Sequence, residues 1–213
     1  MKIKERVLEI AKIFDELYPD ADCSLDYDTP FQLLIATILS AQCTDARVNT
    51  VTPFLFAKYP TTFEMKDARL SDMEKILHPL GFFRSKARNI IACAETLVAD
   101  FGGEVPDTME KLLTLGGVGR KTANLILGDV FGKPSIVTDT HAIRLSNRLG
   151  FTTSKVPKKV EDDLRAIIPP PISTRFCHQL VLHGRAVCNA RKPKCMECKL
   201  LTADLCDANL VGI

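Results

Sequence analysis

The sequence predicts an all-α protein, and two observations support that prediction. Apolar residues recur at helical spacing along most of the chain, whereas the alternating pattern of strands is nearly absent. Helix-start and helix-stop signals divide these segments and leave only short loops between them. The 213 residues are 46% hydrophobic and 25% charged, which is typical of a globular protein with one large domain or two small ones.

The helical segments can be placed in order along the chain. The first carries an apolar stripe from Ile3 to Leu17. The next begins near Pro30 and is apolar on nearly every face over 31–39, as expected for the central helix of a bundle. Two further starts resemble capping boxes, Ser71 with Glu74 and Asp107 with Glu110. Other helices are expected over 85–101, ended by Gly102-Gly103, and over about 120–131, 139–149, 157–168 and 173–187, with a loop at Pro169-Pro170-Pro171.

No segment of the sequence resembles a targeting or membrane-spanning signal. The N-terminal residues follow an amphipathic helical pattern and lack the apolar core of a signal peptide. The longest apolar stretch, 31–39, is too short to cross a bilayer. We therefore expect a cytoplasmic protein with no membrane partner, associated with the nucleoid if it is bacterial. In that compartment disulfides are rare, and clustered cysteines more often bind metal.

Four of the eight cysteines lie in the last 26 residues, at Cys188, Cys195, Cys198 and Cys206, with spacings of x6, x2 and x7. Disulfides, zinc and an iron–sulfur cluster are the alternatives for such a group. Zinc sites usually show two C-x2-C pairs, and here only Cys195 and Cys198 are so paired. The formal charge of +2 would fall to near zero once four thiolates held a divalent centre. Affinity for nucleic acid would then come from a local basic patch.

A glycine-rich turn, Gly116-Gly117-Val118-Gly119, separates two helical segments. A phosphate-binding P-loop would need Gly-Lys-Ser/Thr, but Arg120 separates Gly119 from Lys121. A dinucleotide fingerprint would follow a strand, and the residues before this turn are helical in pattern. A helix–hairpin–helix turn that holds a DNA phosphate through its backbone N–H groups fits better.

Two residues after this turn could carry chemistry. Lys121 falls in the first turn of the second helix, beside Arg120, where it is a candidate amine nucleophile. Asp139 follows 18 residues later and opens another helix. On spacing alone the simpler interpretation is that Asp139 caps that helix and Lys121 is a solvated surface residue.

The motifs together resemble the endonuclease III family of helix–hairpin–helix DNA glycosylases. The similar segments cover almost the whole chain and occur in one order: LLIATILSAQCTD, GFFRSKA, GEVP, LGGVGRKTAN, VTDTH, HGRAVC and ARKPKC. The resemblance implies two helical domains with the active site in a cleft between them. A six-helix domain with the hairpin would span 24–134, and residues 1–23 and 135–213 would together form an iron–sulfur cluster domain.

The resemblance also implies a reaction on double-stranded DNA that contains damaged bases or abasic sites. A damaged base would be flipped out of the duplex. Lys121 would attack the sugar C1′, displace the base and form a Schiff base, and β-elimination would then cut the strand. Asp139 would assist this attack. The protein would thus be a bifunctional DNA glycosylase and AP lyase of base excision repair, acting as a monomer on oxidised pyrimidines.

The resemblance implies further DNA contacts. Gln42 would fill the gap left by the flipped base, and Phe82 would be an apolar wedge between bases, unless it is a core residue. His141 and Arg144 would either line the site or be structural partners near Asp139. The N–H groups of the hairpin glycines, Gly116, Gly117 and Gly119, would bind a phosphate, although the family typically has proline where Gly116 stands, which would loosen the turn.

The resemblance selects a 4Fe–4S cluster among the three alternatives for the cysteines. Its ligands would be Cys188, Cys195, Cys198 and Cys206, although the family typically has five residues before the last cysteine and this chain has seven. The basic residues between the first two ligands, Arg191, Lys192 and Lys194, would form a DNA-binding loop shaped by the cluster.

Two other functions remain as alternatives. A monofunctional mismatch glycosylase would share the fold but lack the lysine. A non-catalytic DNA-binding or electron-transfer protein on this scaffold would have no reason to keep both Lys121 and Asp139.

Overall fold

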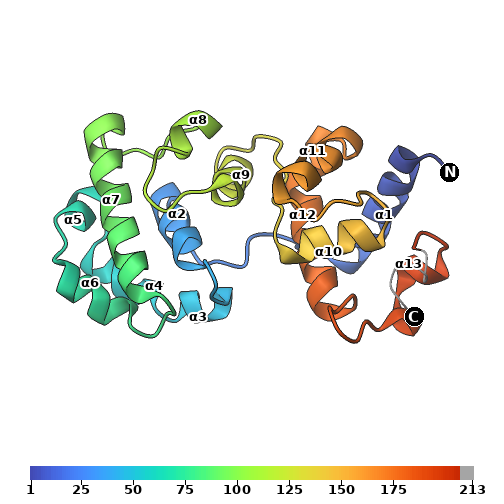
Figure 1. Cartoon of the computed structure of the whole chain (residues 1–213), viewed down its shortest axis with the longest axis horizontal. Coiled ribbons are helices and arrows are strands. Elements are labelled where there is room, and N and C mark those ends of the chain that lie inside the picture. Colours follow the sequence, from blue (N-terminus) through green and yellow to red (C-terminus); the bar gives the residue numbers. More distant parts are fainter. Residues whose placement is uncertain (207–213) are drawn as a thin grey trace. The chain divides into compact units, whose positions relative to one another are not determined.

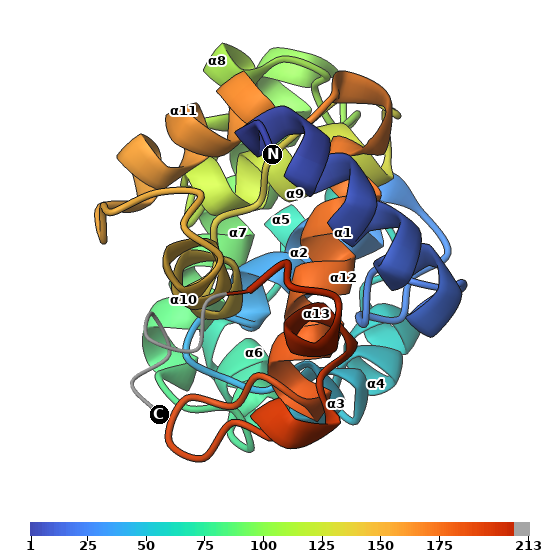
Figure 2. The same ribbon diagram turned by 90° about the vertical axis from the view of Figure 1, so that its right-hand side faces the viewer.

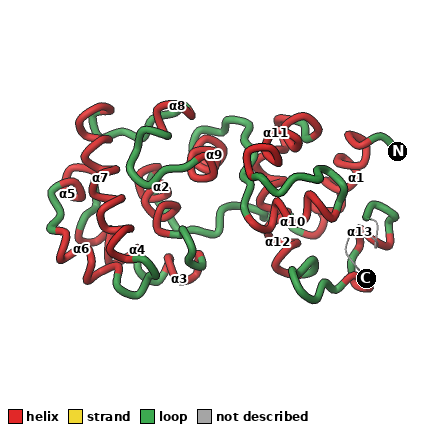
Figure 3. Tube along the Cα trace, viewed as in Figure 1, coloured by secondary structure: helices red, strands yellow, loops and turns green. Residues whose placement is uncertain are grey.

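The computed structural model describes residues 1–206, and in that part of the chain it contains helices and loops but no strand (Figure 3). The all-α prediction is therefore confirmed. Contacts between Cα atoms divide the chain into two units. One unit joins residues 1–22 to the described part of 132–213, and the other covers Cys23–Phe131. Among the described residues, no helix has the length and apolar character needed to cross a membrane.

The unit over Cys23–Phe131 is built around α7 and α2. Helices α5 and α6 pack on α7, and α2 packs against both α7 and α9 (Figure 1). The structure has eight helices here rather than six, and three of them have only four or five residues. The helices are α2 (Pro30–Leu39), α3 (Asp45–Asn49), α4 (Thr52–Lys58), α5 (Thr62–Lys66), α6 (Leu70–Leu77), α7 (Phe83–Phe101), α8 (Met109–Leu112) and α9 (Arg120–Asp129).

Helix α2 is the central helix of this unit, as its apolar sequence predicts. Thr29 caps its N-terminus by accepting a hydrogen bond from the Gln32 N–H, and Pro30 occupies the first position. Eight of its ten residues are buried, so nearly every face contacts other helices. The end of α2 leads directly into Ser40 and Gln42.

The two predicted capping boxes are wrong. Helix α6 starts at Leu70 with Arg69 at the N-cap, so Ser71 lies inside the first turn. Helix α8 starts at Met109 with Thr108, not Asp107, at the N-cap, and the Thr108 hydroxyl accepts a hydrogen bond from the Lys111 N–H. In both cases the pattern of residue types was present one or two positions away from the true helix start, which backbone geometry decides.

The other unit surrounds α12 (Ser173–Ala186). Helix α10 (Thr140–Arg148) packs on α12, and α1 (Ile3–Leu17) contacts α11 (Pro157–Ile167), α12 and α13 (Lys199–Thr202). Figure 2 shows α1, from the start of the chain, beside the helices of its end. The predicted loop at 169–171 contains a 3₁₀ turn, Pro170–Ile172, and a second 3₁₀ turn covers Cys195–Glu197.

The apolar stripe of α1 holds this unit together. Val7, Ile10 and Phe14 are fully buried, and the Phe14 ring lies 5.6 Å from that of Phe176 on α12. The chain beginning is thus packed against the segment that carries the cysteines.

Candidate DNA-binding site and metal centre

The glycine-rich turn between α8 and α9 packs closely against its own unit. The Val118 N–H donates to the Leu115 carbonyl at 3.1 Å, and Gly117 has a φ of +77°, which L side chains rarely adopt. A Cβ on Gly117 would meet Asn89 at 2.9 Å, and one on Gly116 would meet the Asn89 carbonyl oxygen at 2.9 Å. Both glycines are therefore required by packing on α7.

Gly119 differs from these two glycines because the fold does not require it. Its φ of −103° is ordinary, and a Cβ there would meet nothing within 4 Å. It is the N-cap of α9, and its end of the helix has no side-chain cap. The first N–H groups of a helix lack intrahelical partners, so this open, uncapped end can hold an anion.

The predicted nucleophile lies next to that open end. Lys121 is the second residue of α9 and is exposed to solvent. The following residues, Thr122 to Gly128, are all buried and fix the helix beneath it. The amine is therefore accessible, on a helix that is rigidly held.

Asp139 has the structural role that its spacing allowed. It is the N-cap of α10, and its Oδ1 accepts a hydrogen bond from the Ala142 N–H at 2.7 Å. The side chain is half-buried, and the preceding residues, Ser135 to Thr138, are buried. The cap fixes the orientation of the carboxylate and leaves its second oxygen for other partners. Asp139 and Lys121 belong to different units.

Gln42 and Phe82, the two residues predicted to contact the DNA bases, share an unusual backbone conformation. Gln42 has a φ of 53° and Phe82 a φ of 57°, and among the described residues only Asp204 joins them as a non-glycine with positive φ. Each costs about 1–2 kcal/mol, and such strain is enriched at functional sites. Both are exposed, and Phe82 exposes 66% of its surface. The alternative that Phe82 is a core residue is therefore wrong.

Four residues after Phe82, the structure contains a charged group that the sequence did not reveal. Lys86 on α7 is only 4% exposed, and its Nζ has no hydrogen-bond partner in the described part of the chain. Burial lowers its pKa because the charged form is poorly solvated there. Cys93 lies on the same helix and is also buried. Burial raises its pKa to about 12, so the thiol stays protonated and acts as an apolar core residue.

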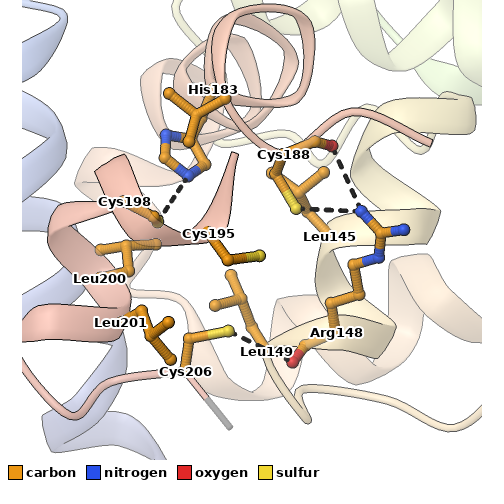
Figure 4. A pocket seen from close by; sticks show the side chains of 11 residues that line it. Leu145, Arg148, Leu149, His183, Cys188, Cys195, Cys198, Leu200, Leu201 and Cys206 are labelled. Carbon is orange, nitrogen blue, oxygen red and sulfur yellow. Dashed lines mark hydrogen bonds between the residues drawn. The ribbon is translucent and has the colours of Figure 1, made fainter. Parts of the chain in front are cut away.

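The four clustered cysteines line one pocket (Figure 4). Its other walls are apolar or basic, with Leu145, Arg148, Leu149, His183, Val187, Leu200 and Leu201. Burial raises the pKa of Cys195, and the nearby Cys188 and Cys198 raise it further. Four thiolates in such a pocket need a cation to compensate their charge, which fits a bound metal centre.

The spread of the sulfur atoms fits a cluster better than a single ion. Among the described residues, no three cysteine sulfurs lie within 4.8 Å of one another. The thiolates of one tetrahedral zinc ion would be about 3.8 Å apart, because Zn–S bonds are about 2.3 Å. Several iron atoms, each bound by one thiolate, require a wider ring of sulfurs.

The x7 spacing before Cys206 is accommodated by a helical turn. Helix α13 fills Lys199–Thr202, and Asp204 follows with a φ of 56°. The Leu205 N–H donates to the Leu200 carbonyl at 2.9 Å and the Asp204 N–H to the Leu201 carbonyl at 3.1 Å, which is a Schellman motif. The motif reverses the chain, so that Cys206 lines the same pocket as the other three cysteines.

Two arginines of α10 organise the loop that begins at Cys188. Arg148 donates to the carbonyls of Asn189 at 2.7 Å and Ala190 at 3.0 Å, and to the Cys188 Sγ at 3.2 Å. Arg144 donates to the Cys188 carbonyl at 3.0 Å. The loop closes where the Lys194 N–H donates to the Val187 carbonyl at 2.9 Å. Its basic side chains, Arg191, Lys192 and Lys194, are all exposed.

A buried histidine lies on the opposite side of the cysteine pocket. The His183 Nε2 is 3.5 Å from the Cys198 Sγ (Figure 4). The His183 Nδ1 is 3.0 Å from the Tyr18 hydroxyl. Burial lowers the pKa of His183 to about 4, so the ring is neutral near pH 7. The HGRAVC motif contained this histidine, but only the fold shows that it faces a cysteine.

Comparisons with known proteins agree with this architecture. Residues 35–170 match the HhH-GPD superfamily base excision DNA repair protein family. Endonuclease III of Synechocystis sp. is 53% identical over 204 residues, covering 95% of this chain and 92% of the relative. Endonuclease III of Escherichia coli K12 is 39% identical over 204 residues, covering 96% of each.

Solved structures give the same result. A structure of a trapped endonuclease III–DNA covalent intermediate aligns with a TM-score of 0.90 and 41% identity, covering 97% of this chain and 96% of that one. A thermostable thymine-DNA glycosylase, at 24% identity and a TM-score of 0.84, shares the fold. By this family membership the protein is an enzyme, a bifunctional DNA glycosylase and AP lyase of base excision repair. The chain belongs to the HhH-GPD superfamily and, within it, to the endonuclease III family.

Proposed function

We propose that this enzyme removes oxidised pyrimidines from double-stranded DNA and cuts the resulting abasic strand through a Schiff base on Lys121. The observation that carries the proposal is an exposed lysine in the first turn of α9, directly after an uncapped, glycine-lined helix N-terminus. A phosphate held at that terminus would bring a deoxyribose close to the amine.

The chemistry assigns one bond change to each step. The Lys121 amine forms a bond to C1′ as the glycosidic C1′–N bond breaks and the base leaves. Opening of the sugar ring gives an imine between Nζ and C1′. Loss of a C2′ proton then forms a C2′=C3′ double bond, breaks the C3′–O bond and releases the strand on the 3′ side, which leaves with a 5′ phosphate. Asp139, held by the Ala142 N–H, would accept the ammonium proton or stabilise positive charge on the sugar.

The DNA would be held by surfaces on both units. The N–H groups around Gly116, Gly117 and Gly119 would bind one phosphate, and Arg191, Lys192 and Lys194 would bind others electrostatically. Gln42 and Phe82 would occupy the space of the extruded base and separate its neighbours. Both side chains are exposed, and both residues have a left-handed backbone that carries a local energetic cost. Strain of this kind is enriched at functional sites, which supports this role.

A 4Fe–4S cluster would be bound by Cys188, Cys195, Cys198 and Cys206, the four cysteines that line one pocket. When bound, it would supply a rigid cross-link between the ends of the basic loop and the chain terminus. Arg148 and Arg144 hold the same loop from α10, the helix that Asp139 caps. We further propose that the units 1–22 with 132–213 and 23–131 correspond to the expected domains, and that the protein acts as a cytoplasmic, nucleoid-associated monomer.

The test is borohydride trapping on two duplexes, one with a single thymine glycol and one with a single abasic site. We expect a covalent adduct on both, and none with Lys121→Gln. The matched control is Lys75→Gln, which removes an 80% exposed lysine side chain of α6 in the same unit. Adducts on the abasic duplex alone would reject oxidised pyrimidines but keep the lysine. Base release without any adduct would favour the monofunctional mismatch glycosylase. The absence of both base release and adduct would favour a binding protein.

A further inference from the structure

A hydrogen-bonded chain of side chains links the N-terminal helix to a cysteine of the proposed cluster. Tyr18, the C-cap of α1, lies 3.0 Å from the His183 Nδ1, and the His183 Nε2 lies 3.5 Å from the Cys198 Sγ. His183 is 2% exposed and packs against the Phe14 ring at 5.1 Å. The imidazole is therefore fixed on both nitrogens and shielded from water.

The chemistry of the three groups sets the direction of both hydrogen bonds. A neutral imidazole carries one proton, so one nitrogen donates and the other accepts. A metal-bound thiolate has no proton and can only accept, which requires Nε2 to carry the hydrogen. Nδ1 must then accept, and the Tyr18 hydroxyl is the group that donates to it. Tyr18 thus stabilises the one tautomer that can donate to Cys198.

We propose that Tyr18 and His183 are positioning residues for the iron–sulfur cluster, which together hold an N–H donor on Cys198 and raise the cluster's reduction potential. This rests on the proposed cluster of the preceding section. A hydrogen bond to a ligand sulfur stabilises the reduced state, which carries the greater negative charge.

The donor on Cys198 differs from the donor on Cys188. The Arg148 guanidinium lies 3.2 Å from the Cys188 Sγ and has only donors. The direction of this hydrogen bond is therefore fixed without the help of a further residue. The His183 ring can reverse its tautomer, and the Tyr18 hydroxyl, which donates to Nδ1, favours the same donating form that the Cys198 thiolate requires. Tyr18 bonds to His183 and His183 bonds to the Cys198 sulfur, so we expect a conservative change at Tyr18 to act on the cluster through His183.

The experiment compares holoprotein carrying Tyr18→Phe with wild type by protein-film voltammetry. We expect the midpoint potential to fall because the oxidised cluster is favoured about tenfold, which is ~59 mV for a one-electron couple. The matched control, Tyr59→Phe, removes the hydroxyl of a buried tyrosine in the other unit and should leave the potential unchanged. An unchanged potential in Tyr18→Phe, or an equal fall in the control, would overturn the proposal.

A second variant distinguishes a relay from a general loosening of the fold. His183→Gln removes the switchable ring, so adding Tyr18→Phe to it should cause no further change in potential. An additive fall in the double variant would mean that Tyr18 acts independently of His183 and would overturn the relay. If His183→Gln fails to fold, the rate of cluster bleaching by ferricyanide in Tyr18→Phe gives a second test, since it should exceed that of wild type and of Tyr59→Phe; an unchanged rate would overturn the proposal.

The failure of this relay can be separated from failure of the proposed activity. Borohydride trapping by Lys121 reports the lyase reaction without reference to the potential. Iron and sulfide analysis of wild type reports the cluster, and a protein without a 4Fe–4S centre would overturn the relay whatever its lyase activity.

Discussion

Phe82→Gly and Phe82→Ala both remove an exposed ring, but they differ in how they treat the backbone beneath it. Phe82 has a φ of 57°, a conformation that costs a residue with a Cβ about 1–2 kcal/mol. Glycine relieves that cost and alanine does not. The pair therefore separates backbone strain from the function of the ring.

The expected free energies follow from burial. About a third of Phe82 is buried, since 66% of it is exposed, and that third is about 70 Å² of a side chain of about 200 Å². At about 25 cal/mol per Å², either substitution loses about 2 kcal/mol of unfolding free energy. Relief of the left-handed strain offsets most of this in Phe82→Gly. We therefore expect the glycine variant to be more stable than the alanine variant by about 1 kcal/mol in urea unfolding.

DNA affinity should respond differently from stability. If the ring stacks on exposed bases, both variants should lose about 1–3 kcal/mol of binding, or roughly 5- to 150-fold in Kd for a duplex with an abasic site. The control is Phe54→Ala, which removes a 73% exposed ring from α4 of the same unit and should leave Kd unchanged. Equal stability of the two Phe82 variants would refute the strain argument, and an unchanged Kd would refute stacking.

Three further predictions follow from the hairpin, the buried amine and the cysteine pocket. Gly119→Ala should leave the Tm unchanged and weaken binding to all DNA sequences alike. Gly117→Ala should also lower the unfolding free energy by about 1–2 kcal/mol, because Gly117 has a φ of +77°. Equal Tm values of the two variants in a melting experiment would contradict this. Lys86→Met should raise unfolding free energy by about 1 kcal/mol at pH 7. The stability gained by Lys86→Met should shrink toward pH 10. The folded wild-type protein releases the Lys86 proton below the unfolded pKa of about 10.4, so wild-type stability rises with pH in that range. A gain in urea unfolding that does not depend on pH would contradict the burial of a charge. Cys206→Ser should reduce iron bound per protein, measured by chemical analysis, while Cys43→Ser should not, and full iron content in the former would exclude Cys206 as a ligand.

The sequence predicted the helices well where the pattern was long and apolar. Helix α2 and helix α7 follow from their periodicity and their flanking Thr29-Pro30 and Gly102. Helices of one turn, such as α3 and α8, have too few residues to show a period. The capping residues failed for a related reason, because Thr108 and Asp107 are both acceptable caps and only the local backbone selects between them.

The candidate site was predictable where a motif named the residues and not where three-dimensional packing created the role. The four clustered cysteines were apparent from their spacing, whereas Lys121 became the expected nucleophile through the resemblance to a known family. The contacts of Arg148 and Tyr18 join residues 40 and 165 positions apart, and no local pattern signals them. The burial of Lys86 was equally hidden, since lysine is ordinarily a surface residue.

The position of the covalent bond to DNA decides whether Lys121 is the nucleophile. Wild-type protein would be trapped with borohydride on an abasic duplex, digested with protease and nuclease, and analysed by tandem mass spectrometry. We expect the sugar remnant on the peptide that contains Lys121, attached at its Nζ. A remnant on another lysine, or on the N-terminal amine, would contradict the proposed active site.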